Sequence, residues 1–213
     1  MRQRQEMVTA SEALPGRATP ITVNRAHLVY GRAFTVEVDD RLQQAHVALG
    51  CFWGAERSFY RLAGVEMTAV GYQGGFTPNP TYEEVCTGRT GHAETVMVAF
   101  DPARLSYDQV LAHFFESHDP TQGNRQGADV GTQYRSAIFV SGDEQAAVAT
   151  RVRDTYDQIL RAAGFGPVTT EITPAGPFYL AEEYHQQYLV ANPQGYCGLG
   201  GTGVACPIGV LGT

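Results

Sequence analysis

The segment AHVALGCFWGAERSFYRLAGVEMTA, residues 45–69, contains the changes of periodicity that decide the fold. Residues 45–49 form a short apolar run that a glycine stops, which is typical of a buried strand. Apolar residues then recur at helical spacing over 51–62, and a second glycine ends this helix. Apolar and polar residues alternate over 65–69. The segment therefore predicts a strand, a helix and a second strand.

The rest of the chain continues this alternation of strands and helices. We expect strands at 93–100, 136–140 and near 168–172, helices after Ser106 and over about 143–163, and turn-rich loops at 71–82 and 118–134. The order strand–helix–strand–strand–helix–strand matches the split βαβ, ferredoxin-like arrangement. We therefore predict an α+β fold, a two-layer α/β sandwich with a ferredoxin-like βαββαβ core.

The chain of 213 residues is long enough for one domain with extensions. Residues 1–40 are rich in proline, glycine and polar residues, and we expect an irregular N-terminal arm there. Residues 41–194 form the predicted catalytic domain. From 195 to 213 the chain is glycine-rich, which predicts a mobile C-terminal tail.

Charge and composition exclude several classes of function. The net charge of −7 argues against nucleic acid or an anionic membrane as a partner, because both bind net basic surfaces. All 15 cationic residues are arginine, so no lysine is present to act as a base or to form a Schiff base. Neither a secretory signal nor an apolar run of about 18 residues is visible. We therefore expect a cytoplasmic protein, whose thiols stay reduced.

The four cysteines, at positions 51, 86, 197 and 206, form no C-x-x-C pair, so their spacing does not indicate a zinc site. Cys51 follows a predicted strand and opens a predicted helix. Backbone N–H groups at a helix N-terminus stabilise an anion, which predicts a lowered pKa and a reactive thiolate. Position alone also fits a small buried hydrophobe. The neighbouring Phe52 and Trp53 either line an apolar pocket beside the sulfur or belong to the core.

Glu94 is a carboxylate on the apolar face of the predicted strand 93–100, in register with Val96, Val98 and Phe100. Burial would raise its pKa and leave a neutral acid that is able to donate a proton at pH 7. The alternative is a solvated charge at the exposed end of the strand. Periodicity leaves both open.

A series of motifs along the chain resembles, in sequence and in order, the peptide methionine sulfoxide reductases of the A type. The motifs are GCFWGAE at 50–56, GYQGG at 71–75, NPTYEEV at 79–85, TGHAE at 90–94, RQGADVGTQYRSAIF at 125–139 and GYCGLGG at 195–201. The resemblance covers the chain from about residue 40 onward. It implies reduction of methionine S-sulfoxide, free or in proteins, and hence repair of oxidatively damaged proteins.

The resemblance implies roles for particular residues. Cys51 would attack the sulfoxide sulfur and become a sulfenic acid, while Glu94 protonates the oxygen. Other positions match substrate-binding residues of the family. Tyr82 and Tyr134 would donate hydrogen bonds to the sulfoxide oxygen, and Asp129 would help to bind the substrate. Phe52 and Trp53 would surround the methyl group.

For recycling, the resemblance implies that Cys197 attacks the sulfenic acid and that Cys206 then attacks Cys197. Thioredoxin or another dithiol would reduce the final disulfide, with no bound cofactor and no metal. Alternatively, the tail thiols are inert. We interpret Cys86 as a structural thiol and assign no catalytic role to a histidine.

Two other classes of protein remain as alternatives. One is a hydrolase or transferase that uses Cys51, His92 and a carboxylate. The other is a non-catalytic metal-binding module built on the four cysteines.

Overall fold

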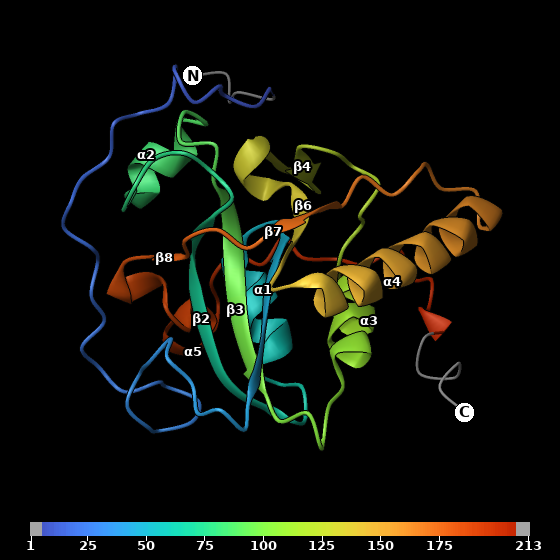
Figure 1. Ribbon diagram of the computed structural model, residues 1–213, viewed down its shortest axis with the longest axis horizontal. Coiled ribbons are helices and arrows are strands. Elements are labelled where there is room, and N and C mark those ends of the chain that lie inside the picture. The colour runs from blue at the N-terminus through green and yellow to red at the C-terminus, as the bar shows by residue number, and fades with distance from the viewer. Residues whose placement is uncertain (1–5, 208–213) are drawn as a thin grey trace.

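The computed structural model describes residues 6–207, and its centre is a six-stranded sheet in the order β7-β6-β1-β3-β2-β8 (Figure 1). The elements are β1 Gln43–Leu49, α1 Phe52–Phe59, β2 Val65–Gln73, α2 Tyr82–Cys86, β3 Ala93–Phe100, α3 Tyr107–Ser117, β4 Arg125–Gln126, β5 Asp129–Val130, the 3-10 helix η1 Thr132–Tyr134, β6 Ser136–Val140, α4 Asp143–Ala162, β7 Glu171–Pro174, β8 Tyr179–Leu180, the 3-10 helix η2 Glu183–His185 and α5 Tyr188–Ala191.

Four strands of the sheet, in the order β6-β1-β3-β2, make up the predicted core. Every neighbouring pair among them is antiparallel, so β3 lies between β1 and β2, which α1 connects. This is the ferredoxin-like arrangement, and the predicted fold is confirmed. β7 adds to β6 in parallel, and β8 adds to β2 antiparallel. The predicted strand near 168–172 is β7, which begins only at Glu171.

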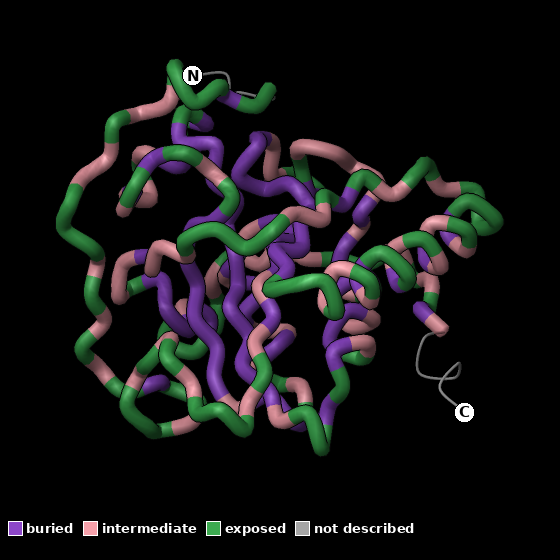
Figure 2. The backbone as a smooth tube through the Cα atoms, viewed as in Figure 1, coloured by how far each residue is buried: buried purple, intermediate pink, exposed green. Residues whose placement is uncertain are grey.

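One face of the sheet packs against helices α1, α3 and α4 (Figure 1). The main core cluster lies between them and includes Val96, Val98 and Phe100 from β3. This face was identified correctly from the alternation in the sequence. Every residue of β3 is buried, however, so the opposite face is covered as well (Figure 2).

The opposite face of the sheet carries Met67, Ala69, Met97 and Ala99. Apolar side chains of the arm pack on it, together with Phe178 and Leu180; the arm residues are Phe34, Val36 and Val38. From residue 6 to the start of β1 the arm follows the outside of the domain, with a single isolated bridge between Ala26 and Ala33 (Figure 1). Residues 1–5 of the predicted arm lie outside the described residues.

The segment 118–134, which we expected to be a loop, contains a small ribbon. β4 and β5 pair through Gln126 and Asp129, so the turn between them has two residues. Gly127 opens this turn with a φ of 57°, which glycine adopts without strain. A two-strand ribbon of this length has no hydrophobic periodicity, which is why the sequence pattern did not reveal it.

The described part of the C-terminal tail, up to residue 207, lies against α3 and α4. The Tyr156 hydroxyl donates to the Val204 carbonyl at 2.8 Å, and the Cys206 N–H donates to Glu116 Oε1 at 2.7 Å. Residues 208–213 of the predicted tail lie outside the described range. Between residues 6 and 207, no helix is long and apolar enough to cross a membrane.

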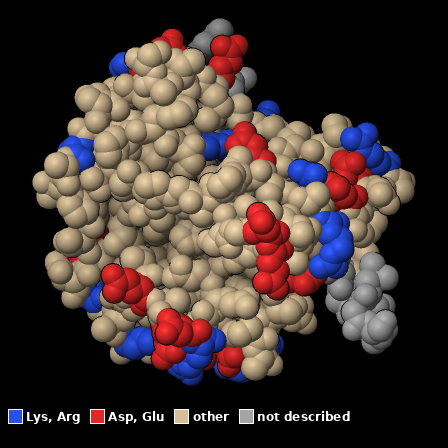
Figure 3. Space-filling view, viewed as in Figure 1, with Lys and Arg blue, Asp and Glu red and all other residues tan. Residues whose placement is uncertain are grey.

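The surface seen in Figure 3 carries charges of both signs. Arginine and carboxylate side chains lie close together along its lower and right-hand margins, and most of the remaining area is uncharged. The ion pairs of the molecule include those of Glu66, which is within 4 Å of Arg32, Arg41 and Arg104. On this face no continuous basic patch is visible.

Candidate active site

Cys51 lies at the junction between β1 and α1, as the sequence predicted. Gly50 turns the chain with a φ of 100°, and Cys51 is the N-cap residue of α1. A Cβ at Gly50 would come within 2.8 Å of the Gln126 side chain, so the β4–β5 ribbon approaches the turn closely because glycine is there. The ribbon and the helix N-terminus therefore meet beside the half-buried Cys51 thiol.

The prediction that the pKa of Cys51 is lowered was wrong. Burial raises the pKa of the thiol, and a negative charge on Glu94 would raise it further. Hydrogen bonds from the N–H groups of Trp53 and Gly54 act in the opposite direction but are outweighed. The sequence argument counted the helix N-terminus and omitted desolvation, which depends on tertiary packing. The resting residue is therefore a thiol.

Glu94 occupies the position on β3 that faces the helix layer, and its side chain is only 2% exposed. Its Oε2 accepts a hydrogen bond of 2.9 Å from the N–H of Phe52, the residue directly after Cys51. Burial raises the pKa of Glu94 to about 8, so the carboxyl group is mostly neutral at pH 7. The expectation of a buried, neutral acid is confirmed, and the alternative of a solvated charge is wrong.

Tyr82 and Tyr134 both lie near this carboxyl group, although 52 positions separate them in the sequence. Tyr82 begins α2, and Tyr134 ends η1. For both tyrosines burial raises the pKa most, and the proximity of Glu94 raises it further. Each phenol is therefore a protonated hydrogen-bond donor at neutral pH.

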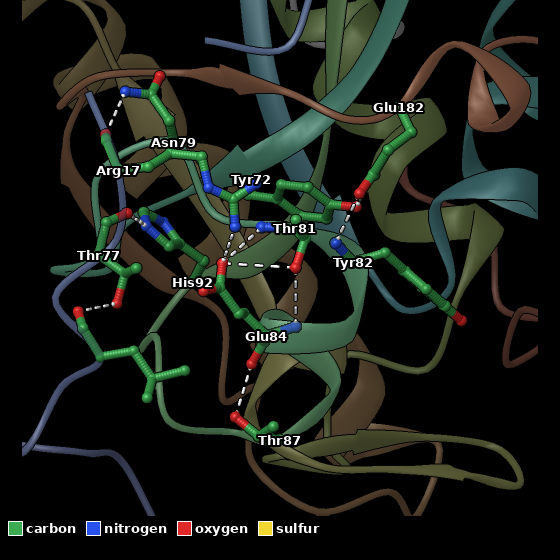
Figure 4. A network of polar contacts seen from close by, with 11 residues as sticks. Arg17, Tyr72, Thr77, Asn79, Thr81, Tyr82, Glu84, Thr87, His92 and Glu182 are labelled. Atoms are coloured by element: carbon green, nitrogen blue, oxygen red, sulfur yellow. Dashed lines mark hydrogen bonds and ion pairs between the residues drawn. The ribbon is translucent and has the colours of Figure 1, made fainter. Parts of the chain in front are cut away.

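The N-terminal arm holds the loop that leads to Tyr82 (Figure 4). Arg17 forms an ion pair of 2.7 Å with Glu84, and its carbonyl accepts a hydrogen bond from the Asn79 amide. Glu84 is also the third residue of α2, where it completes a capping box with Thr81. The start of α2 is thus fixed both by its own cap and by the arm.

His92 lies in the same network and has no ring nitrogen available to activate Cys51. Its Nδ1 accepts from the N–H of Gly75 at 3.0 Å, and its Nε2 is 2.7 Å from the carbonyl of Thr77 (Figure 4). Both contacts hold the loop between β2 and α2. The alternative in which His92 serves as the base of a hydrolase is therefore not supported.

The aromatic residues after Cys51 occupy different environments. Phe52 is fully buried and packs against Tyr72 and His185, with ring centroids 5.8 and 5.1 Å apart. Trp53 is only partly buried; it stacks on Tyr188 at 3.9 Å and donates its indole N–H to His185 Nδ1 at 2.8 Å. Trp53 is therefore the more accessible of the two beside the Cys51 sulfur.

Asp129 and the tail lie on the other side of Cys51. Asp129 accepts a hydrogen bond of 3.2 Å from the hydroxyl of Tyr196, and its charge contributes to the raised pKa of Cys51. Burial raises the pKa of Asp129 itself. Tyr196 brings the following residue, Cys197, to the same place. A Cβ at Gly54 would lie only 2.9 Å from the Cys197 sulfur, so this thiol rests on the first turn of α1.

Cys206 is held away from this turn. It is buried in the main core cluster, where its N–H donates to Glu116 near the end of α3. No disulfide involves a cysteine in the described part of the chain. Within residues 6–207, no three histidine, cysteine, aspartate or glutamate side chains are grouped so that they could hold a metal ion. The alternative of a metal module built on the cysteines therefore has no support.

Sequence reasoning missed two residues of this site, Glu182 and Tyr196. Glu182 accepts hydrogen bonds from the hydroxyl of Tyr72 and the N–H of Tyr82, about 100 residues away (Figure 4). No local pattern connects such distant positions. Tyr196 directly precedes Cys197 in the motif GYCGLGG, and this position could have indicated from the sequence that Tyr196 belongs to the site.

Comparisons with known proteins agree with the motifs. A family model described as "Peptide methionine sulfoxide reductase" matches residues 43–202. Peptide methionine sulfoxide reductase MsrA 1 of Caulobacter vibrioides is 59% identical over 205 residues, which cover 96% of this chain and 94% of that protein.

Solved structures are similar as well. Methionine sulfoxide reductase A of Corynebacterium diphtheriae has 45% identity and a TM-score of 0.85, covering 94% of this chain and 98% of that one. Mxr1 from Saccharomyces cerevisiae in reduced form has 34% identity and a TM-score of 0.70, covering 82% and 94%. The same yeast protein is known in complex with Trx2, at 22% identity, a TM-score of 0.50 and coverage of 72% and 90%.

Proposed function

The chain belongs to the peptide methionine sulfoxide reductase family and reduces methionine sulfoxide, and from this premise we propose that Cys51 is the nucleophile of the reaction and Glu94 its acid. The observation that carries the proposal is the hydrogen bond from Phe52 N–H to Glu94, which keeps the neutral carboxyl group beside the Cys51 thiol. We further propose that the substrate is the S epimer, free or within oxidised proteins, so that the enzyme repairs them.

The proposed first step transfers the sulfoxide oxygen to Cys51. The Cys51 sulfur attacks the sulfoxide sulfur and forms an S–S bond, while Glu94 gives its proton to the oxygen. The hydroxyl group then passes from the substrate sulfur to the Cys51 sulfur as the S–S bond and the S–O bond of the substrate break, which releases methionine and leaves a sulfenic acid on Cys51. The substrate sulfur gains two electrons, and the Cys51 sulfur loses two. The proton of the thiol passes to Glu94, so the carboxyl group is neutral again.

Binding of the substrate uses the groups around this pair. Tyr82 and Tyr134 donate hydrogen bonds to the sulfoxide oxygen, which becomes more basic as the S–O bond breaks. Phe52 and Trp53 hold the methyl group, and Asp129 binds the polar part of the substrate. The raised pKa values of both tyrosines support this role, because each phenol keeps its proton.

The proposed recycling consumes two tail thiols and an external reductant. Cys197 attacks the sulfenic acid of Cys51, which releases water and forms a disulfide. Cys206 then attacks Cys197, which frees Cys51 and leaves a Cys197–Cys206 disulfide. The contact of Cys197 with Gly54 supports this order, since Cys206 is held at α3 and must leave Glu116 to react.

Thioredoxin, or another dithiol, is the proposed reductant of that disulfide in the cytoplasm, without a bound cofactor. The complex of yeast Mxr1 with Trx2 supports a thioredoxin-type partner. The three-part organisation belongs to this proposal: an arm at 1–40, the reductase domain at 41–194 and a tail at 195–213 that moves during recycling.

The test is turnover of each methionine sulfoxide epimer with dithiothreitol. Cys51→Ser should abolish reduction, because Cys51 directly precedes the N–H that holds Glu94. Cys86→Ser is the matched control and should retain activity, since this thiol is proposed to be structural. Turnover of Cys51→Ser at a rate near that of the wild type would contradict the assignment.

A further inference from the structure

The segment 182–185 contacts both groups of residues that are proposed to bind the substrate, those that hold the methyl group and those that bind the oxygen. Trp53 donates its indole N–H to Nδ1 of His185 at 2.8 Å. An indole nitrogen donates and does not accept, so His185 Nδ1 must be the acceptor. A neutral imidazole with an unprotonated Nδ1 carries its proton on Nε2. The hydrogen bond to Trp53 thus fixes the tautomer of His185.

The His185 ring is 1% exposed and is surrounded by aromatic rings. The centroid distances are 5.1 Å to Phe52, 5.6 Å to Trp53 and 4.5 Å to Tyr82. Burial lowers the pKa of His185 to about 4, so the ring is neutral at pH 7. His185 therefore touches both the residues proposed to hold the methyl group and a tyrosine proposed to bind the oxygen.

The protonated side of His185 points toward Glu182. Among residues 6–207, no hydrogen-bond acceptor pairs with His185 Nε2, and Glu182 Oε2 lies 3.9 Å from it. Glu182 accepts hydrogen bonds of 2.9 Å from the Tyr72 hydroxyl and from the N–H of Tyr82 (Figure 4). Tyr82 is the first residue of α2, so Glu182 fixes where this helix begins.

We propose that Glu182 and His185 are a pair of positioning residues that set the distance between the methyl-binding side of the pocket and its oxygen-binding side. The proposal rests on the function proposed above. His185 orients the Trp53 indole, whose nitrogen is its only polar atom, and Glu182 holds the backbone of Tyr82. Neither residue takes part in the chemistry.

A consequence for specificity follows from this geometry. If the Trp53 ring is held at a fixed tilt, the space for the alkyl group on sulfur is fixed as well. A pocket fitted to a methyl group typically discriminates against one more methylene by about 10- to 200-fold. Loss of the His185 acceptor should therefore narrow the preference for methionine sulfoxide over its S-ethyl analogue, ethionine sulfoxide.

The first experiment uses two substitutions of His185 that differ in one contact. His185→Asn keeps an oxygen near the place of Nδ1 and should still accept from Trp53. His185→Phe keeps the ring volume but removes the acceptor. Trp53 is the only tryptophan of the chain, so fluorescence excited at a wavelength that tyrosine does not absorb reports its surroundings alone. His185→Phe should shift this emission to shorter wavelength, whereas His185→Asn should leave it near that of the wild type.

The same variants are compared in turnover with dithiothreitol. His185→Phe should raise KM for methionine sulfoxide roughly fivefold or more, the equilibrium factor for losing one hydrogen bond, and should reduce the preference over ethionine sulfoxide. His185→Asn should restore most of both. His113→Phe is the matched control: this half-buried histidine packs edge-on to Phe59, and its Nε2 is buried without a partner among the described residues. It should change neither emission nor preference.

Glu182→Gln tests the second member of the pair. The Tyr72 hydroxyl and the Tyr82 N–H donate to different oxygens of Glu182, and a glutamine replaces one of these oxygens by an NH2 group. One acceptor is therefore lost, and kcat/KM should fall roughly fivefold or more. Glu183→Gln, at the next position, is the control and should remain near wild type. If His185→Phe does not fold, the comparison of Glu182→Gln with Glu183→Gln still tests the proposal.

Unchanged emission, or an unchanged substrate preference, in a folded His185→Phe variant would overturn the inference, as would equal kinetics of Glu182→Gln and Glu183→Gln. The proposed function fails separately, through turnover that does not depend on Cys51.

Discussion

Replacement of Glu94 by glutamine separates the two tasks that this side chain performs. The glutamine carbonyl can still accept the 2.9 Å hydrogen bond from Phe52, so the N-terminus of α1 keeps its partner. The amide has no proton to transfer. A positioned general acid typically contributes 10²- to 10⁴-fold. We therefore expect methionine release in the variant to be slower by at least about 100-fold, with the fold retained.

The pH dependence of the wild type follows from the pKa of about 8. The proposed step begins with both protons in place, one on Cys51 and one on Glu94. Because the pKa of the thiol is raised further, Glu94 is the first of the two to ionise. The rate should be nearly flat below pH 7 and should fall about tenfold between pH 7 and pH 9, as the neutral fraction decreases from about 90% to about 10%.

The measurement is methionine release in a single turnover, with enzyme in excess and no reductant present, from pH 5 to pH 10. This design removes the pH dependence of recycling. A rate that rises up to pH 8 and then stays level would refute the reasoning, because it would mean that the pair reacts after losing one proton. A Glu94→Gln variant that retains both the wild-type rate and the wild-type profile would refute the role of Glu94 altogether.

Three further predictions concern recycling and stability. Cys206→Ser, treated with one equivalent of sulfoxide, should accumulate a Cys51–Cys197 disulfide; peptide mapping that finds Cys51 bridged to Cys206 first in the wild type would reverse the order. Gly54→Ala should displace the Cys197 sulfur, 2.9 Å from the added methyl group, so stopped-flow measurement should show slower disulfide formation but an unchanged first step. Glu56 is fully buried, and burial raises its pKa from 4.5 to about 7. Between these pH values the unfolded chain loses the proton that the folded protein keeps, so the free energy of unfolding should decrease from pH 4.5 to pH 7 by at most about 3 kcal/mol. Over this range urea unfolding should show a larger loss of stability in the wild type than in Glu56→Gln, in which Glu94 still titrates, and parallel curves would contradict it.

Local periodicity was enough to predict the core of the fold. The strand–helix–strand pattern of 45–69 corresponds to β1, α1 and β2, and Ser106 caps α3 with a capping box as its position suggested. The placement of Glu94 on the face of β3 that meets the helices was also readable, because strand side chains alternate strictly.

Other properties of the site depend on the third dimension. The pKa of Cys51 could not be predicted from its helix position, because the burial that raises it comes from packing by distant segments. The contact of Glu182 with Tyr82 joins the N-cap of η2 to α2 through a backbone N–H, which leaves no trace in residue types. Phe34, Val36 and Val38 alternate with polar residues, but this short pattern does not indicate which surface of the domain the arm covers.

The packing of the arm on the second sheet face affects how the enzyme responds to the oxidants that produce methionine sulfoxide. Met67 and Met97 lie on the second sheet face beneath Phe34, Val36 and Val38, with 3% and 0% of their surface exposed. Peroxide in solution reaches a thioether only where its sulfur is accessible. The arm shares this cover with Phe178 and Leu180, so the packing of residues 34–38 helps to keep the enzyme from becoming its own substrate.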